Sequence, residues 1–256
     1  MTDCEIYLSK LSNESNLTAE VSSKLGADFS IGEIPAISDV CIKLYVSDEK
    51  IENTAVNGII KTLKETSETM ENVSVEIIEE EFLNLIKDNR ITPDSKPRTL
   101  IHRDGDLHAT VHIWLIKRKD MGIYVLLQKR SMNKDTHPGY IDVSVAGHVR
   151  QGREFRDTAA KELFEEIGIS AAPEKLEYIG MKQSSINDDK IKDNEVSAVY
   201  IYRGDVDIDN LKLQKNEVEE VYVAEIDELI ACMKNQPFKH CIEMEELEML
   251  KKSVFR

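Results

Sequence analysis

The chain has little of what marks several common protein classes. Its 256 residues include one Trp and 6% aromatic residues in all, and 33 basic residues against 48 acidic ones leave a net charge of −15. Nucleic acids and anionic membrane surfaces are bound through clustered Lys and Arg, so this balance argues against either as a partner. No apolar run approaches the roughly 18 to 20 residues that span a bilayer, so the sequence predicts a soluble globular protein.

Cysteine is also sparse. The four residues, Cys4, Cys41, Cys232 and Cys241, lie far apart and form neither a CxxC pair nor the spacing of a metal finger. No stretch of basic and then apolar residues precedes them, as a secretory signal would require. The sequence therefore predicts free thiols in a reducing compartment and a cytoplasmic protein.

What is present predicts one large domain or two small ones. Hydrophobic residues make up 41% of the chain and charged residues 32%, enough for a sizeable core. Residues 1–77 are rich in Ser, Asn, Thr and Glu, contain no His, and predict a small α/β domain. Its predicted elements are strands at "CEIYL", "DVCIKLYV" and "VSVEII" and a helix over residues 48–68. Because no catalytic group stands out there, the hypothesis for this domain is binding or homodimer formation.

Residues 78–256 predict a second domain built on a mixed sheet. "DSKPRT" is typical of a loop, and "HRDGDLH" holds an Asp-Gly turn between two histidines. In "HATVHIWLI", His108, Thr110, His112 and Trp114 face one way and the residues between them the other, as in a strand. "KDMG" then leads into "IYVLLQKR", which predicts a hairpin. Further strands are predicted at "IDVSV", "LEYIGMKQ", "EVSAVYIY" and "EVEEVYVA", and helices over residues 157–167, 225–234 and 239–252.

The predicted helix over residues 157–167 crowds negative charge. Glu162, Glu165 and Glu166 are three and four residues apart, so they share one side of the helix, where like charges cost roughly 0.2–0.5 kcal/mol per pair. One interpretation is a solvated acidic face. The other depends on the flanking glycines: Gly147 ends a strand and starts a loop, and Gly168 stops the helix. A strand, a loop and a carboxylate-lined helix make a site for hard divalent cations, which prefer oxygen ligands.

That frame closely resembles the signature of the Nudix hydrolases. The matching positions are Gly147, Glu162, Leu163, Glu165, Glu166, Gly168 and Ile169. Two positions differ: Arg153 stands where the family has Glu, and Lys161 stands where it has Arg. The resemblance implies that the family's Glu and Arg form an ion pair that braces the loop against the helix, whereas Arg153 and Lys161 would repel. Glu154 could take the place of the missing Glu after a small shift of the loop. The resemblance covers about residues 79–235. It implies a Nudix-type mixed β-sheet between helices, preceded by the small α/β domain.

The resemblance also implies a mechanism. Glu162, Glu165 and Glu166, with a backbone carbonyl near Ala146 or Gly147, would hold one to three Mg²⁺ or Mn²⁺ ions, which cancel charge on a diphosphate and activate a water. Glu166 or Glu165 is the candidate general base, with a later loop as the alternative. The substrate would be a small-molecule X-linked diphosphate, and the few aromatic residues leave the X group open among nucleoside, sugar, coenzyme and prenyl groups.

A second set of residues resembles the Nudix branch that includes isopentenyl-diphosphate isomerase. In "HRDGDLHATVHIW", "AGHV" and "DNEVSAVYIY", that resemblance implies a second metal site, with ligands at His102, His108, His148, Asp193 and Glu195. Asp193 and Glu195 would project from one face of a strand, about 7 Å apart, whereas His112 lies about 13 Å from His108, too far to share the ion. The alternative is that these histidines are structural.

The same comparison favours a hydrolase over an isomerase. The isomerase carries a catalytic cysteine where this chain has Ala146, and Cys232 and Cys241 fall in a predicted helical stretch with no evident route to the site. Arg130 and Lys134 match basic residues that grip the diphosphate in that branch, with a solvated loop as the alternative. An isomerase, a catalytically weak binding module and a purely structural acidic face remain the rival hypotheses.

Overall fold

The computed structural model describes residues 2–7, 40–47, 54–69, 73–119, 122–187, 192–235 and 238–254. Its contacts divide the chain into two compact units, one of residues 1–83 with 94–104 and one of residues 84–93 with 105–256. The predicted division into residues 1–77 and 78–256 stays a prediction. Residues 48–53 of the first predicted helix and residues 120 and 121 of the "KDMG" turn lie outside the described residues.

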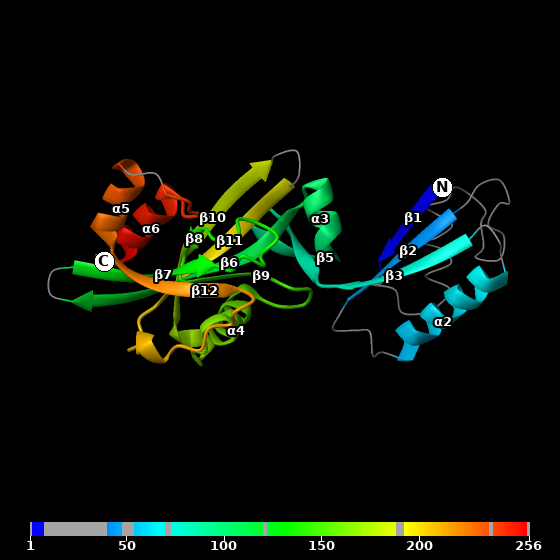
Figure 1. The fold of residues 1–256 in the computed structure, drawn as a ribbon, viewed down its shortest axis with the longest axis horizontal. Coiled ribbons are helices and arrows are strands. Elements are labelled where there is room, and N and C mark those ends of the chain that lie inside the picture. Colours follow the sequence, from blue (N-terminus) through cyan, green and yellow to red (C-terminus); the bar gives the residue numbers. More distant parts are fainter. Residues whose placement is uncertain are drawn as a thin grey trace. The chain divides into compact units, whose positions relative to one another are not determined.

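The first unit contains a three-stranded parallel sheet in the order β1-β2-β3 (Figure 1). The three strands and the helix predicted for this region are all found, as β1 (Thr2–Tyr7), β2 (Val40–Ser47), α2 (Thr54–Thr69) and β3 (Val73–Glu80). Alternate residues of β2 are apolar, and Ile42, Leu44 and Leu63 are fully buried. Parallel strands need a crossover, and α2 supplies the one between β2 and β3.

The predicted loop at "DSKPRT" is wrong. Residues of that segment complete strand β5 (Arg90–Pro97) and begin helix α3 (Arg98–Asp104). β5 pairs with β4 (Phe82–Lys87) across a tight turn in which Asp88 and Asn89 have φ of 51° and 56°. Asp and Asn tolerate this left-handed conformation, so the turn forms without the glycine from which a turn is usually predicted. The Asp-Gly turn predicted in "HRDGDLH" is found directly after α3, with Gly105 at φ 78°.

Tertiary contacts explain why α3 forms where local sequence suggests a loop. Leu100 is buried in a cluster with Tyr45 and Phe82, and the Arg98 backbone N–H donates to the Glu81 carbonyl at 3.0 Å. The Arg98 guanidinium also pairs with the Glu81 carboxylate at 3.1 Å. A seven-residue helix has little intrinsic stability in water, so these contacts decide its formation.

The second unit is organised around the long strand β6 (Leu107–Lys119). Its first part runs parallel to β11 and antiparallel to β9, and its last residues pair antiparallel with β7, as the predicted hairpin requires. The described strands form a nine-stranded sheet with β10-β11-β6-β4-β5 as its main path. The remaining strands are β7 (Gly122–Arg130), β8 (Ile141–Asp142), β9 (Val145–His148), β10 (Leu176–Asn187), β11 (Lys192–Tyr202) and β12 (Val218–Glu225).

Helices cover both faces of this sheet, which confirms the predicted Nudix-type arrangement (Figure 1). On one face, Val111 and Ile113 of β6 pack in a cluster with Leu163 of α4 (Phe155–Ile167). On the other, Trp114 packs in a cluster with Leu247 of α6 and residues of α5. The two C-terminal helices are α5 (Ile226–Asn235) and α6 (Met244–Val254). None of the helices in the described part of the chain is long and apolar enough to cross a membrane.

Two predicted elements of this unit are corrected. "IDVSV" is divided between β8 and β9, because the Ser144 hydroxyl bonds to the Leu126 carbonyl and the Leu115 N–H and interrupts the ladder. The helix predicted over residues 239–252 begins only at Met244, because the preceding residues pair with β8: the Cys241 N–H donates to the Ile141 carbonyl at 2.8 Å.

Candidate active site

Helix α4 ends where the sequence predicts and begins two residues earlier, at Phe155 instead of residue 157. Glu154 is the N-cap residue, and Gly168 follows the last helical residue with φ 77° in the left-handed region. The Gly168 N–H donates to the Phe164 carbonyl at 2.9 Å, and the Ile169 N–H donates to the Leu163 carbonyl at 3.2 Å. Only glycine takes this conformation without strain, so the predicted helix stop at Gly168 is confirmed.

Gly147 lies directly under one of the three carboxylates. A Cβ atom placed on Gly147 would lie 2.6 Å from Cδ and 2.9 Å from Oε2 of Glu162. Any side chain at residue 147 would push the Glu162 carboxylate away, so the glycine in β9 is what lets this carboxylate lie against the strand backbone. Strand β9 and helix α4 are therefore in close contact at Gly147, the first residue of the motif, and Glu162, the first of its three helical carboxylates.

The three carboxylates of α4 lie in different surroundings. Glu166 is 2% exposed, and its Oε2 accepts a hydrogen bond from the Gln128 side chain at 3.1 Å. Burial, opposed by the Lys134 ammonium, raises the pKa of Glu166 from 4.5 to about 8. Glu165 is largely exposed, with its carboxylate 2.5 Å from the Lys161 ammonium, and Glu162 lies 3.7 Å from the same ammonium.

Lys161 therefore has a different partner from the one that the resemblance implies. Its ammonium pairs with neighbouring carboxylates of its own helix, so the predicted repulsion is balanced locally. The loop between β9 and α4 is braced instead by Asn84 of β4, a buried residue whose amide donates to the Arg150 carbonyl at 2.9 Å and the Arg153 carbonyl at 3.0 Å. Sequence reasoning missed Asn84, because nothing in its local pattern points to a loop 66 residues away.

Four of the five residues of the second predicted metal site lie together in the second unit. Nε2 of His108 lies 3.6 Å from Oδ1 of Asp193 and 3.9 Å from Oε1 of Glu195, and Nε2 of His148 lies 3.8 Å from the same Glu195 oxygen. The two imidazole rings stack with centroids 5.3 Å apart. Burial and the Asp193 charge raise the pKa of Glu195, which an added cation would oppose. His102 lies on α3 in the first unit, and its predicted role stays a prediction.

The strand register explains how these residues meet. His108 faces Glu195 across the parallel β6 and β11 pair, and His148 enters from β9 on the opposite side of β6. Asp193 and Glu195 are two residues apart on β11, so they project from one face, as predicted. The ligand atoms of His108, Asp193 and Glu195 all lie within 4.8 Å of one another, close enough to hold one cation.

The two basic residues predicted to bind diphosphate are held by acidic neighbours. Arg130 donates to the Asp142 carboxylate at 2.9 Å and to the Thr136 carbonyl, and Lys134 pairs with the Glu217 carboxylate. Although burial lowers the pKa of Arg130, the Asp142 charge raises it further, so the group stays charged. These contacts orient both cations at the end of β7, where α4 carries Glu166.

Comparisons with known proteins agree with this geometry. A family model described as NUDIX domain matches residues 106–243, which is more than half of the 256 residues.

The chain belongs to the Nudix family.

Its relatives include hydrolases and isomerases of that family. An uncharacterised Nudix hydrolase of Clostridium acetobutylicum is 36% identical over 159 residues, covering 62% of this chain and 77% of that protein. An isopentenyl-diphosphate Delta-isomerase of Paenarthrobacter aurescens is 32% identical over 124 residues, covering 48% of this chain and 66% of that protein. Among solved structures, DR0079 from Deinococcus radiodurans is 19% identical with a TM-score of 0.48, covering 69% of this chain and all of that one.

Beside the histidine and carboxylate cluster, the second unit contains a buried charged network. The Glu246 carboxylate of α6 is fully buried and accepts hydrogen bonds from Nδ1 of His112 at 3.0 Å and Nε1 of Trp114 at 2.8 Å. The Lys182 ammonium lies 3.3 Å from it and 3.0 Å from Glu243. His112, predicted to lie too far from His108 to share its ion, is thus a buried residue with a defined acidic partner. Sequence reasoning missed Glu246, which lies 134 residues from His112.

The position of Cys241 in the Nudix domain corrects another expectation. Cys232 is exposed on α5, whereas Cys241 lies in the segment before α6, beside β8. Burial and the Asp142 carboxylate raise the pKa of the Cys241 thiol to about 12, and the charges of Arg130 and Glu195 also act on it. Cys241 therefore lies in the segment that pairs with β8 and not in the helix that the sequence predicts.

Proposed function

We propose that the Nudix domain hydrolyses the diphosphate linkage of a small X-linked diphosphate with a metal-activated water. The observation that carries the proposal is the packing of Glu162 against Gly147 beside the buried Glu166. This packing puts motif carboxylates against the strand backbone, where a substrate diphosphate could be held between α4 and the cations Arg130 and Lys134.

The residues present fit a divalent cation. Glu162, Glu165 and Glu166 offer only oxygen atoms, the donors that Mg²⁺ and Mn²⁺ prefer. The pKa of Glu166 is raised because the protein offers too little positive charge to stabilise the buried carboxylate in its ionised form. A bound cation would supply that charge. When bound, the ion supplies Lewis acidity and lowers the pKa of a water.

Other residues have complementary roles in this proposal. Arg130 and Lys134 bind the diphosphate oxygens, and their present acidic partners keep them oriented until substrate arrives. Glu166 is favoured over Glu165 as general base, because its carboxylate is enclosed beside Gln128 whereas that of Glu165 faces solvent and Lys161. Asn84 positions the loop that leads into α4.

Phosphate or pyrophosphate release from a panel of diphosphates tests the proposal. The panel contains ADP-ribose, dinucleotides, deoxynucleoside triphosphates, coenzymes and prenyl diphosphates, with Mg²⁺ or Mn²⁺. Metal-dependent turnover by the wild type, lost in Glu166→Gln and kept in Glu154→Gln, is the expected result. Glu154→Gln is the matched control because Glu154 is exposed, directly precedes α4 and makes no side-chain cap bond to it. Metal binding with no turnover of any substrate would favour a binding module.

A second candidate is isomerisation of isopentenyl diphosphate, favoured by the cluster of His108, His148, Asp193 and Glu195. Ala146 cannot donate or accept the proton that this reaction moves at carbon, which makes the isomerase the weaker candidate. Deuterium incorporation into a prenyl diphosphate from solvent, without phosphate release, would establish it. A mononuclear metal at this cluster fits its mixed nitrogen and oxygen donors and is proposed for either reaction.

The role of the first unit is proposed on sequence grounds. A homodimer formed through it predicts twice the mass of the 29.2 kDa chain in solution. Light scattering of the full chain measures this directly, and a monomer at all concentrations would rule it out. A cytoplasmic location likewise stays a proposal, based on the pattern of cysteines.

A further inference from the structure

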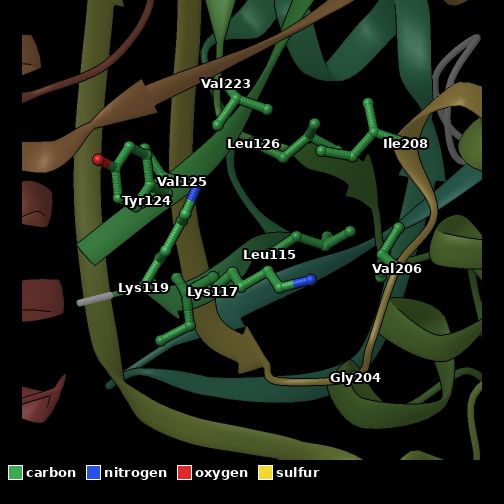
Figure 2. Close-up of a pocket in the computed structure, with 11 residues that line it drawn as sticks. Leu115, Lys117, Lys119, Tyr124, Val125, Leu126, Gly204, Val206, Ile208 and Val223 are labelled. Atoms are coloured by element: carbon green, nitrogen blue, oxygen red, sulfur yellow. The ribbon is translucent and has the colours of Figure 1, made fainter. Parts of the chain in front are cut away.

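The Nudix domain contains a cavity that the hydrolase proposal does not use. It has a volume of about 290 Å³ and lies where the hairpin of β6 and β7 meets β12 and the segment after β11 (Figure 2). Its aliphatic lining includes Leu115, Leu126, Val206, Ile208 and Val223. This volume is close to the lower limit of about 300 Å³ for small-molecule sites.

Strand alternation explains why the cavity is apolar. Leu115 and Leu126 belong to the core cluster that packs against α4, so the cavity floor is a continuation of that face of the sheet. Beyond α4, the segment after β11 covers this face with Val206 and Ile208 (Figure 2). The floor is buried, at 5% and 4% exposure for the two leucines, whereas Ile208 and Val223 are 39% and 49% exposed. The apolar surface is therefore continuous from the floor to the outside.

The mouth of the cavity carries positive charge. Lys117 and Lys119 follow Leu115 at steps of two along β6, so they extend on the same side of the sheet and line the cavity (Figure 2). They belong to three consecutive basic residues in a chain of net charge −15. Lys117 pairs with Asp205 at 3.0 Å, but the side chains are 66% and 91% exposed, so an anionic ligand can displace that weak pair.

The cavity is separate from the candidate active site. Lys117 lies nine residues along β6 from His108, which at about 3.3 Å per residue is a separation of about 30 Å. On β7, Tyr124 and Leu126 line the cavity in the first half and middle of the strand, whereas Arg130 is its last residue. The head-group lysines are therefore remote from the histidine cluster, and none of the residues that line the cavity is a carboxylate of α4.

We propose that this cavity binds a single-chain amphiphilic anion, with an alkyl tail between Leu115, Leu126 and Val206 and its anionic head group at Lys117 and Lys119. The aliphatic floor and the open aliphatic rim suit the tail, because burying each methylene removes apolar surface from water. The two ammonium groups at the mouth suit a carboxylate or a phosphate head. The proposal does not depend on the hydrolase activity.

Calorimetric titration of the full chain with n-alkyl carboxylates of six to fourteen carbons, kept below their micelle concentrations, tests the proposal. Affinity is expected to rise about fourfold per methylene until the cavity is full, and then to level off. An alcohol of the same chain length is expected to bind at least tenfold more weakly, and an alkyl phosphate at least as well as the carboxylate. No saturable binding at any length, or equal affinity for alcohol and carboxylate, would overturn the proposal.

Two variants locate the site. Lys119→Glu is expected to weaken carboxylate binding at least tenfold, whereas Lys234→Glu, the same charge change at an exposed position of α5, changes it less than twofold. Val223→Trp places a bulky ring at the partly exposed rim and is expected to shorten the chain length at which affinity levels off. Equal effects of the two lysine variants would overturn the proposal. So would concentration-dependent association abolished by Val223→Trp, since the occupant would then be a second copy of the chain.

Discussion

Replacing Glu246 by Gln should destabilise the second unit far more than the small chemical change suggests. The variant keeps the side-chain shape but leaves the cations of Lys182 and His112 without their buried negative partner. Burial would raise the pKa of Glu246, but His112, Lys182 and Trp114 outweigh it and lower that pKa from 4.5 to about 2. At about 1.4 kcal/mol per pKa unit, the fold stabilises the ionised form by about 3 kcal/mol. Breaking a buried ion pair costs a similar amount, about 3–5 kcal/mol.

Urea unfolding at pH 6, followed by the fluorescence of the only tryptophan, measures this loss directly. Trp114 donates to Glu246 and therefore reports on the unit that contains the network. The matched control is Glu243→Gln, which removes a 45% exposed partner of the same lysine and should cost only about 0–1 kcal/mol. If Glu246→Gln cost no more than Glu243→Gln, the reasoning from burial would be refuted.

The pH dependence gives the prediction a second test. The Glu246 contribution is fully present above pH 4.5 and is lost as pH falls towards 2, because its pKa is lowered in the fold. Burial lowers the pKa of His112, but Glu246 raises it above 6.5 overall, so that contribution is present below pH 6.5 and is lost at higher pH. The stability difference between the wild type and Glu246→Gln should therefore be largest between pH 4.5 and 6.5. A difference that stays constant from pH 3 to pH 9 would contradict this explanation.

Three further predictions concern the candidate site. Asn84→Ala removes both hydrogen bonds to the loop before α4 and should cost about 1–3 kcal/mol, with faster hydrogen exchange in that loop; unchanged exchange would contradict the brace. Gly147→Ala puts a methyl group 2.6 Å from Glu162 and should weaken Mn²⁺ binding at least tenfold in a calorimetric titration, whereas unchanged affinity would exclude that carboxylate as a ligand. Cys241 should react with a thiol reagent at least tenfold more slowly than exposed Cys232 at pH 8, because burial raises its pKa to about 12, and Cys232→Ser identifies the fast component.

Sequence periodicity was enough to predict the elements that form the frame of the site. The alternation in "HATVHIWLI" has the correct faces, since Val111 and Ile113 pack on the α4 side and Trp114 packs on the α6 side. The C-terminal end of α4 follows from residue type, because Gly168 takes a left-handed conformation. Both features depend on residues close in the chain, which is why a single sequence contains the information.

Contacts between residues far apart in the chain could not be predicted from local sequence patterns. The partner of His112 lies on a helix 134 residues away, and Asn84 braces a loop from a strand outside the recognised motif. Helix α3 forms because Leu100 is buried by distant residues, although its local sequence is typical of a loop. Local patterns specify secondary structure, but the pairing of side chains across the sheet depends on the complete topology.

The measurement that tests the central claim most directly is the fate of solvent isotopes in one reaction. The full chain is incubated with Mg²⁺ and diphosphate substrates in deuterated ¹⁸O-water, and the products are followed by ³¹P NMR and mass spectrometry. The proposed function predicts one ¹⁸O atom in a released phosphate product, no deuterium at carbon, and loss of both turnover and label in Glu166→Gln. Deuterium in a prenyl diphosphate without ¹⁸O in phosphate would contradict hydrolysis and establish the isomerase in its place.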